Sequence, residues 1–178
     1  MIRSSGPLAY ALMRVLFRVR DLIWPPAKAL KRIGLATGQT FLDYGSGPGS
    51  YALAAARIVG PAGKVYAVDS NPQAVEHLRQ AAGRANLSNV TPILADSPAV
   101  LPAGSADLAL LHDVLHELSD PPGVLAGLAG ALKADGLLVV SDHHMNESAI
   151  VSAVTAAAPF ERAASFAGVY VFRRTGRG

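Results

Sequence analysis

Three glycines at alternate positions, just after an acidic residue, form the segment of this chain with the clearest chemical meaning. The segment reads DYGSGPGS and places Gly45, Gly47 and Gly49 close behind Asp43. Glycines adopt positive backbone angles and let a ligand approach the main chain closely. An apolar run precedes the segment and an alanine-rich stretch follows it, so we expect a strand, a tight loop and a helix whose first amides point at the ligand. The pattern is typical of a loop that binds a nucleotide cofactor.

The charge beside this loop separates two kinds of nucleotide cofactor. A dinucleotide-binding fingerprint, G-x-G-x-x-G, requires glycine at the position of Ser50, where this chain has serine. Asp43 would also repel a pyrophosphate, whereas it would attract S-adenosylmethionine, which has no phosphate and carries an ammonium and a sulfonium. Two unit charges about 4 Å apart attract each other by roughly 4 kcal/mol at an effective dielectric constant of about 20. The residues therefore favour the methyl donor over a nicotinamide dinucleotide.

Acidic residues also end the strands that we expect further along the chain. Asp69 follows Gly49 by 20 residues, where an acid accepts hydrogen bonds from ribose hydroxyls in nucleotide-binding folds. Asp96 ends a third strand and, with Ser97, is placed to address an adenine amino group. Asp113 follows a fourth strand, where a role in the site and a helix cap are both open. Because ligands of open α/β sheets bind beyond the carboxyl ends of the strands, we expect these side chains on one rim.

Four of the five histidines follow two strands that we expect to be neighbours: His112, His116, His143 and His144. Three interpretations of this cluster remain open. A neutral imidazole could act as a general base, the imidazoles with Asp113 or Asp142 could bind a metal ion, or ring hydrogen bonds could fix two loops. The spacing completes no metal motif, so we expect no metal and take His112, His116 and His143 as the catalytic candidates.

These side chains need a scaffold that brings strand ends together, and the rest of the sequence predicts one. Short apolar runs alternate with alanine-rich stretches that are compatible with helices. The predicted strands are Thr40–Tyr44, Lys64–Asp69, Val90–Ala95, Asp107–Leu111 and Gly136–Ser141. The predicted helices between them are Tyr51–Val59, Pro72–Ala85 and Pro122–Leu132. This alternation indicates a doubly wound, Rossmann-like α/β fold with a mostly parallel sheet covered on both faces.

The last part of the chain departs from this alternation. Lys133 to Gly136 is expected to end the preceding helix in a glycine turn. A small-residue helix, Ser148–Ala158, then precedes two strands, Phe160–Ala167 and Val169–Arg174, which we expect to form an antiparallel hairpin.

Residues 1–34 are predicted to be a helical segment that covers the site as a lid, and residues 35–178 to be the cofactor-binding domain. The lid hypothesis rests on an apolar helical face, with Tyr10 and Trp24 closing the site and a second short helix at Ala27–Ile33. Packing against the domain and a weak contact with a membrane surface are alternatives. Arginines interrupt the apolar stretch, which predicts neither a transmembrane helix nor a signal peptide, so a cytoplasmic protein is expected.

Composition excludes several other functions. The chain has 178 residues, 51% of them hydrophobic and 16% charged, a net charge of +3 and no cysteine. This balance argues against disorder, and the missing cysteines exclude disulfides, thiolate–zinc sites and a cysteine nucleophile. No basic stripe interleaved with aromatic residues is present, so we expect no nucleic-acid partner.

Five segments resemble, in order, the motifs of class I S-adenosylmethionine-dependent methyltransferases, in the style of the small methyltransferases of ubiquinone and menaquinone biosynthesis. They are LDYGSGPGSY, VYAVDSNP, ILADS, LALLHDVLHEL and LKADGLLVVSD. Nine positions match the family's cofactor-binding residues: Asp43, Gly45, Gly47, Asp69, Ser70, Asn71, Asp96, Ser97 and His112. The resemblance implies that the first three hold the methionine end and the next three the ribose and adenosine. It further implies that Asp96 and Ser97 meet adenine and that His112 lines the methionine pocket.

The resemblance implies transfer of a methyl group from S-adenosyl-L-methionine to a small molecule, expected to be apolar, by in-line displacement that leaves S-adenosyl-L-homocysteine. A nicotinamide-dependent oxidoreductase and a non-catalytic cofactor-binding module are the alternatives. After the fourth strand, His112-Asp113-Val114-Leu115 departs from the Asn-Pro-Pro-Tyr motif of amino methyltransferases, which argues against DNA adenine and protein glutamine as acceptors. A homodimer built through the N-terminal helix is a further hypothesis.

Overall fold

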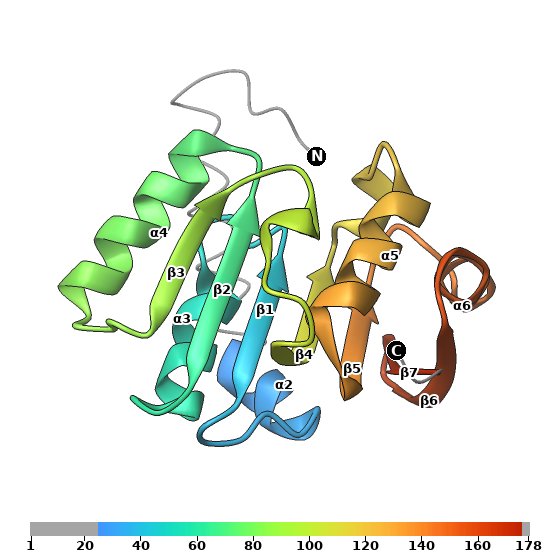
Figure 1. Cartoon of the computed structure of the whole chain (residues 1–178), viewed down its shortest axis with the longest axis horizontal. Coiled ribbons are helices and arrows are strands. Elements are labelled where there is room, and N and C mark those ends of the chain that lie inside the picture. Colours follow the sequence, from blue (N-terminus) through green and yellow to red (C-terminus); the bar gives the residue numbers. More distant parts are fainter. Residues whose placement is uncertain (1–24, 176–178) are drawn as a thin grey trace.

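A seven-stranded sheet runs through the protein with helices on both faces (Figure 1). The computed structural model describes residues 25–175. The strands are β1 (Thr40–Tyr44), β2 (Lys64–Asp69), β3 (Val90–Leu94), β4 (Ala106–His112), β5 (Leu132–Ser141), β6 (Phe160–Phe166) and β7 (Val169–Arg174). The helices are α2 (Pro26–Arg32), α3 (Ser50–Val59), α4 (Pro72–Arg84), α5 (Pro121–Ala131) and α6 (Glu147–Ala157), with short 3₁₀ turns η1 (Pro98–Val100) and η2 (Leu115–Glu117).

The strand order is β3-β2-β1-β4-β5-β7-β6. Strands β1 to β5 pair in parallel, and β7 runs antiparallel to both β5 and β6. The predicted doubly wound α/β fold with an antiparallel C-terminal hairpin is therefore confirmed. Strands β1 to β3 are added toward one edge of the sheet, and β4 returns to the other side of β1. Such a switch point opens a crevice at the carboxyl ends of the strands.

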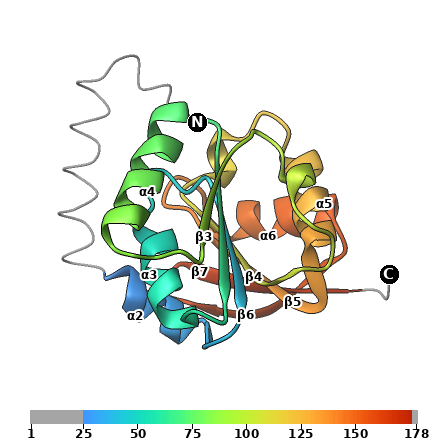
Figure 2. The ribbon, with the colours of Figure 1, turned by 60° about the vertical axis from the view of Figure 1, so that its left-hand side comes forward.

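Alternate residues of the central strands pack into two separate cores. Phe41 and Leu108 belong to the core under α2, α3 and α4, whereas their neighbours Leu42 and Ala109 belong to the core under α5 and α6. Figure 2 shows these two groups of helices on opposite sides of the sheet. Strands buried on both faces must be apolar at every position, which explains the uninterrupted apolar runs in the sequence.

Side-chain caps set where the helices begin. The Asn71 side chain accepts a hydrogen bond from the Gln73 amide and precedes Pro72, the first residue of α4. Asp120 caps α5 and Asn146 caps α6 in the same way. Each cap satisfies an amide that has no partner within its helix.

The prediction that Lys133–Gly136 ends a helix in a glycine turn is wrong, because this segment is the first part of β5. Only Asp107 of β4 stands opposite it, since Ala106 pairs with Leu132 and the next pair joins Leu108 to Leu137. Lys133 Nζ lies 2.6 Å from an Asp107 carboxylate oxygen, a contact that holds the irregular segment against β4. A Cβ at Gly136 would lie 3.0 Å from the Ala106 carbonyl oxygen, so the glycine allows close strand approach rather than ending a helix.

Helix α2 packs into the domain beside the beginning of β1 (Figure 1). Leu30 is fully buried in the core, and the Arg32 guanidinium lies 4.5 Å from the centre of the Phe166 ring. Most of the expected lid, including Tyr10 and Trp24, falls outside the described residues. Within residues 25–175, no helix has the length and apolar character needed to cross a membrane.

Replacing Gly49 with alanine is expected to lower the free energy of unfolding by about 2 kcal/mol. Gly49 has a φ of +90°, and a Cβ there would lie 2.3 Å from Cδ1 of Leu78, which is fully buried and has no room to move away. Urea denaturation measures the change. The matched control is Gly83→Ala in α4, where a Cβ meets nothing within 4 Å, and this variant should gain about 0.5 kcal/mol from helix propensity. Equal effects of the two variants would contradict the argument.

Candidate functional site

The glycine loop turns the chain sharply between β1 and α3. The amides of Gly45 and Ser46 both donate to the Val68 carbonyl, at 2.8 and 3.0 Å, and so tie the loop to β2. A side chain at Gly45, whose φ is +76°, would place its Cβ 2.4 Å from Cγ2 of Val114. Glycine is therefore needed where the loop passes the segment after β4.

A cleft of about 240 Å³ opens beside this loop, at the carboxyl ends of the strands. The loop, the end of β2 and the segment after β4 line it. Among the described lining residues there is no lysine or arginine, but there are four carboxylates: Asp43, Asp69, Asp113 and Glu117. Asp43 and Asp69 are only 3% and 6% exposed. The cleft is therefore chemically suited to a cationic ligand and unsuited to a pyrophosphate.

The Asp69 carboxylate connects the glycine loop to the beginning of α4. One oxygen accepts the Gly47 amide at 2.7 Å and the other accepts the Asn71 amide at 2.8 Å. Burial raises the pKa of Asp69 above its ordinary value and the charge of Glu117 adds to this, although the two amide hydrogen bonds oppose the rise. The acid is thus held in place by the same backbone groups that shape the cleft.

Six of the nine predicted cofactor-binding residues line the cleft: Asp43, Gly45, Gly47, Asp69, Asn71 and His112. Ser70, Asp96 and Ser97 are not among the lining residues. Ser97 instead accepts a hydrogen bond from the Ala99 amide and caps η1.

The backbone of Asp96 contacts Tyr44, the last residue of β1. The Tyr44 hydroxyl donates to the Asp96 carbonyl at 2.7 Å and anchors the loop after β3. Burial, with smaller contributions from the charges of Asp96 and Asp69, raises the pKa of Tyr44 to about 12. The hydroxyl therefore keeps its proton and remains a donor.

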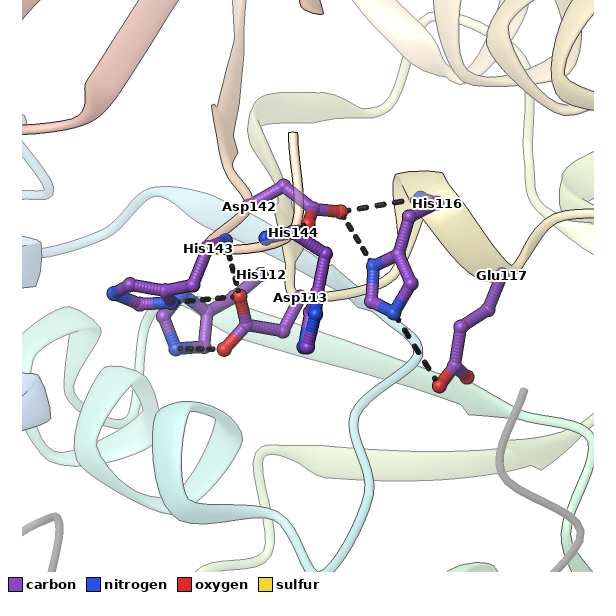
Figure 3. A network of polar contacts seen from close by, with 7 residues as sticks. All are labelled: His112, Asp113, His116, Glu117, Asp142, His143 and His144. Atoms are coloured by element: carbon purple, nitrogen blue, oxygen red, sulfur yellow. Dashed lines mark hydrogen bonds and ion pairs between the residues drawn. The ribbon is translucent and has the colours of Figure 1, made fainter. Parts of the chain in front are cut away.

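The loops after β4 and β5 exchange two histidine–aspartate pairs (Figure 3). Asp113, after β4, accepts the amide and Nδ1 of His143 at 2.9 and 2.8 Å. Asp142, after β5, accepts the amide and Nδ1 of His116 at 3.1 and 2.8 Å. Each loop thus provides one carboxylate and one histidine. We call this arrangement the reciprocal clasp.

Both carboxylates of the reciprocal clasp are held in their charged form. Burial works to raise the pKa of Asp113, but hydrogen bonds and charge from His143, with charge from His112, outweigh it and lower the pKa. Burial acts likewise on Asp142, and hydrogen bonds from His116 and the His144 amide lower its pKa. The clasp therefore joins the two loops through hydrogen bonds to two charged carboxylates.

The three catalytic candidates differ in their access to the cleft. His112 and His116 line it, whereas the side chain of His143 is 71% exposed and is not among the lining residues. His112 also lies against Tyr51, with ring centres 4.7 Å apart, and its Nε2 is 3.5 Å from an Asp113 oxygen. Within residues 25–175, no group of three or more His, Asp or Glu side chains is arranged to hold a metal ion.

Several polar residues of the cleft were not selected as site residues from the sequence, among them Ser46, Ser50, Tyr51 and Glu117. Ser46 lies between two glycines of the loop, so its position in the sequence could have predicted that it lines the cleft. Its Oγ is buried and has no hydrogen-bond partner among the described residues. Glu117 stands within the fourth family-like segment, but only the 3₁₀ turn η2 brings it to the cleft.

A family model described as a methyltransferase domain matches residues 35–167 of this chain. The chain is 48% identical over 73 residues to "Probable cobalt-precorrin-6B C(15)-methyltransferase (decarboxylating)" of Sulfolobus acidocaldarius. The aligned stretch covers 41% of this chain and 38% of the relative. It is 32% identical over 114 residues to the protein of the same name from Thermoplasma volcanium, with coverages of 64% and 55%. The chain thus spans about half, or less, of the length of these curated relatives.

The fold is also similar to that of a solved S-adenosylmethionine-dependent methyltransferase from Aquifex aeolicus. The TM-score is 0.75 at 26% sequence identity, and the match covers 84% of this chain and 88% of the other. The shared fold therefore extends over most of both proteins.

Asp142→Asn is expected to lower the free energy of unfolding at neutral pH by about 2 kcal/mol, because it weakens hydrogen bonds to a buried charge. The folded-state pKa of Asp142 lies below its ordinary value of 3.8. Its stabilisation is therefore complete above that value and is lost as the pH falls through the folded-state pKa. Urea titrations over a pH series should show wild type and variant converging in acid. Exposed Asp135→Asn is the control and should show no difference at any pH. A gap between wild type and Asp142→Asn that is unchanged in acid would argue against the clasp.

Proposed function

This chain belongs to the class I methyltransferase family, and from that membership we propose that it binds S-adenosyl-L-methionine in the acidic cleft and transfers its methyl group to a small molecule. The observation that carries the proposal is the charge of the cleft. Four carboxylates and no described lysine or arginine line it. A cofactor with an ammonium and a sulfonium matches this lining, whereas the pyrophosphate of a nicotinamide dinucleotide does not.

The described residues fit this cofactor at both ends. We assign the methionine end to Asp43, Gly45 and Gly47, with the buried Ser46 hydroxyl as an added polar group. Asp69 is assigned to the ribose, since each of its oxygens accepts a single amide and keeps a lone pair. We assign Asn71, which lines the cleft, and Ser70, which does not, to the adenosine.

When bound, S-adenosylmethionine supplies a methyl group on a sulfonium that is already activated for displacement. The protein therefore has to orient the acceptor, exclude water and, where the nucleophile requires it, remove a proton. The candidates for the last task are the three imidazoles that line the cleft, those of His112, His116 and His144.

The acceptor is proposed to be a small molecule that presents a polar group to the cleft. The sequence favoured an apolar acceptor, but His116, Glu117 and His144 provide a polar lining on the segments after β4 and β5. We therefore expect any apolar part of the acceptor to lie away from these three side chains.

Isothermal titration calorimetry tests the cofactor assignment. S-adenosylhomocysteine should bind and NAD should not. Asp43→Asn keeps the shape of the side chain but removes its charge, so it should weaken S-adenosylhomocysteine binding about tenfold, or roughly 1.4 kcal/mol. Asp135→Asn, on an exposed part of β5, should bind like wild type. Tighter binding of NAD than of S-adenosylhomocysteine would overturn the proposed function in favour of an oxidoreductase.

A further inference from the structure

We infer that Asp142 and His116 form a proton-accepting pair, so that the acceptor carries a proton on the atom that becomes methylated. The inference rests on the proposed methyl transfer and narrows its substrate class to acceptors whose attacking atom carries a proton, such as the O–H of a hydroxyl or the N–H of an amine. Carboxylate and tertiary-amine acceptors are excluded, because they have no proton to lose.

The orientation of the His116 ring follows from the way Asp142 is held. The Asp142 side chain is fully buried, and the His116 and His144 amides donate to its two oxygens at 3.1 and 3.0 Å. The oxygen that accepts the His116 amide also lies 2.8 Å from Nδ1 of the same residue. Because an ionised carboxylate only accepts hydrogen bonds, Nδ1 carries the proton and Nε2 of the neutral ring keeps a lone pair.

That lone pair belongs to a ring that lines the cleft. The His116 side chain is 24% exposed, and its Nε2 lies 3.5 Å from an oxygen of Glu117, another lining residue (Figure 3). The lone pair on Nε2 of His116 suits a substrate group that donates a hydrogen bond. The Glu117 carboxylate also stabilises the imidazolium that forms when Nε2 takes up a proton.

The other half of the reciprocal clasp provides an internal comparison. His143 makes the same contact with Asp113, at 2.8 Å, but its ring is 71% exposed and lies outside the lining of the cleft. The same chemical pair is thus present twice. Of the two histidines, only His116 combines an oriented ring with access to the cleft.

The reaction balances with this pair as base. A lone pair on the acceptor oxygen or nitrogen forms the bond to the methyl carbon, and the carbon–sulfur bond breaks with its electrons going to sulfur. The proton on the attacking atom passes to Nε2 of His116, and the imidazolium later releases it to water. A carboxylate acceptor has no proton on its attacking oxygen, so it would not need this base.

Nitrogen-15 NMR of the histidine-labelled full chain, saturated with S-adenosylhomocysteine, tests the ring. We expect His116 to be protonated on Nδ1 with a bare Nε2, and Asp142→Asn to abolish this preference. Among the described residues, the charged or titratable groups that face the ring are Asp142, Glu117 and His144, whose ring centre lies 4.3 Å away. A proton on Nε2 of neutral His116 in the wild type would overturn the inference.

The bond in the methylated product tests the substrate class. The chain is incubated with methyl-labelled S-adenosylmethionine and the small-molecule fraction of an extract from its source cells, and the labelled product is treated with mild base. Methyl ethers and methylamines keep their label, as we expect, whereas methyl esters lose it as methanol. Base-labile label would overturn the inference and leave the proposed methyl transfer intact.

Matched histidine variants then locate the base. His116→Gln should lower incorporation about a hundredfold while S-adenosylhomocysteine affinity is retained. His77→Gln on α4, away from the cleft lining, should leave incorporation unchanged. Unchanged incorporation by His116→Gln would refute the assignment of the base. No binding of S-adenosylhomocysteine and no incorporation by wild type would instead refute the proposed function itself.

Discussion

Carboxylates at the rim of the sheet accept hydrogen bonds from backbone amides of the loops around them. The shape of the site depends on these hydrogen bonds. Asp69 accepts the Gly47 and Asn71 amides, Asp142 accepts those of His116 and His144, and Asp113 accepts that of His143. A buried charge without such partners would cost several kcal/mol. The Gly47, His116 and His143 amides thus reach an acid at the end of another strand, whereas the Asn71 and His144 amides turn back to an acid two residues earlier.

The same constraint explains how the protein maintains an acidic cleft. Amide donors stabilise a carboxylate without neutralising it, whereas lysine or arginine would cancel its charge. The cleft consequently keeps a negative field for a cationic ligand while the acids remain fixed. Position and charge are thus provided by different groups, the backbone for the first and the side chains for the second.

Features that depend on short stretches of sequence were predictable. The apolar runs gave the central strands to within a few residues, because strands covered on both faces exclude polar residues. The glycine loop was equally clear, since its conformation needs residues without a side chain. Asp43, Gly45 and Gly47, which line the cleft, were accordingly identified, whereas Ser46 in the same loop was not.

Features that depend on pairing between distant segments were not predictable. In the first part of β5, Lys133 meets Asp107 across the sheet, and no local sequence pattern shows this pairing. The Asp142–His116 contact joins residues 26 positions apart. Sequence analysis grouped the histidines correctly, but only the spatial arrangement separates the ring that faces the cleft from the ring that faces solvent.

The reciprocal clasp has a consequence for anyone who wishes to redesign the site. Each of its two loops contributes one donor and one acceptor to the other, so neither is complete by itself. Transplanting one of them from another protein would strand an aspartate and a histidine at the rim together. A graft intended to alter acceptor preference must therefore replace both segments together, from Asp113 to His116 and from Asp142 to His144.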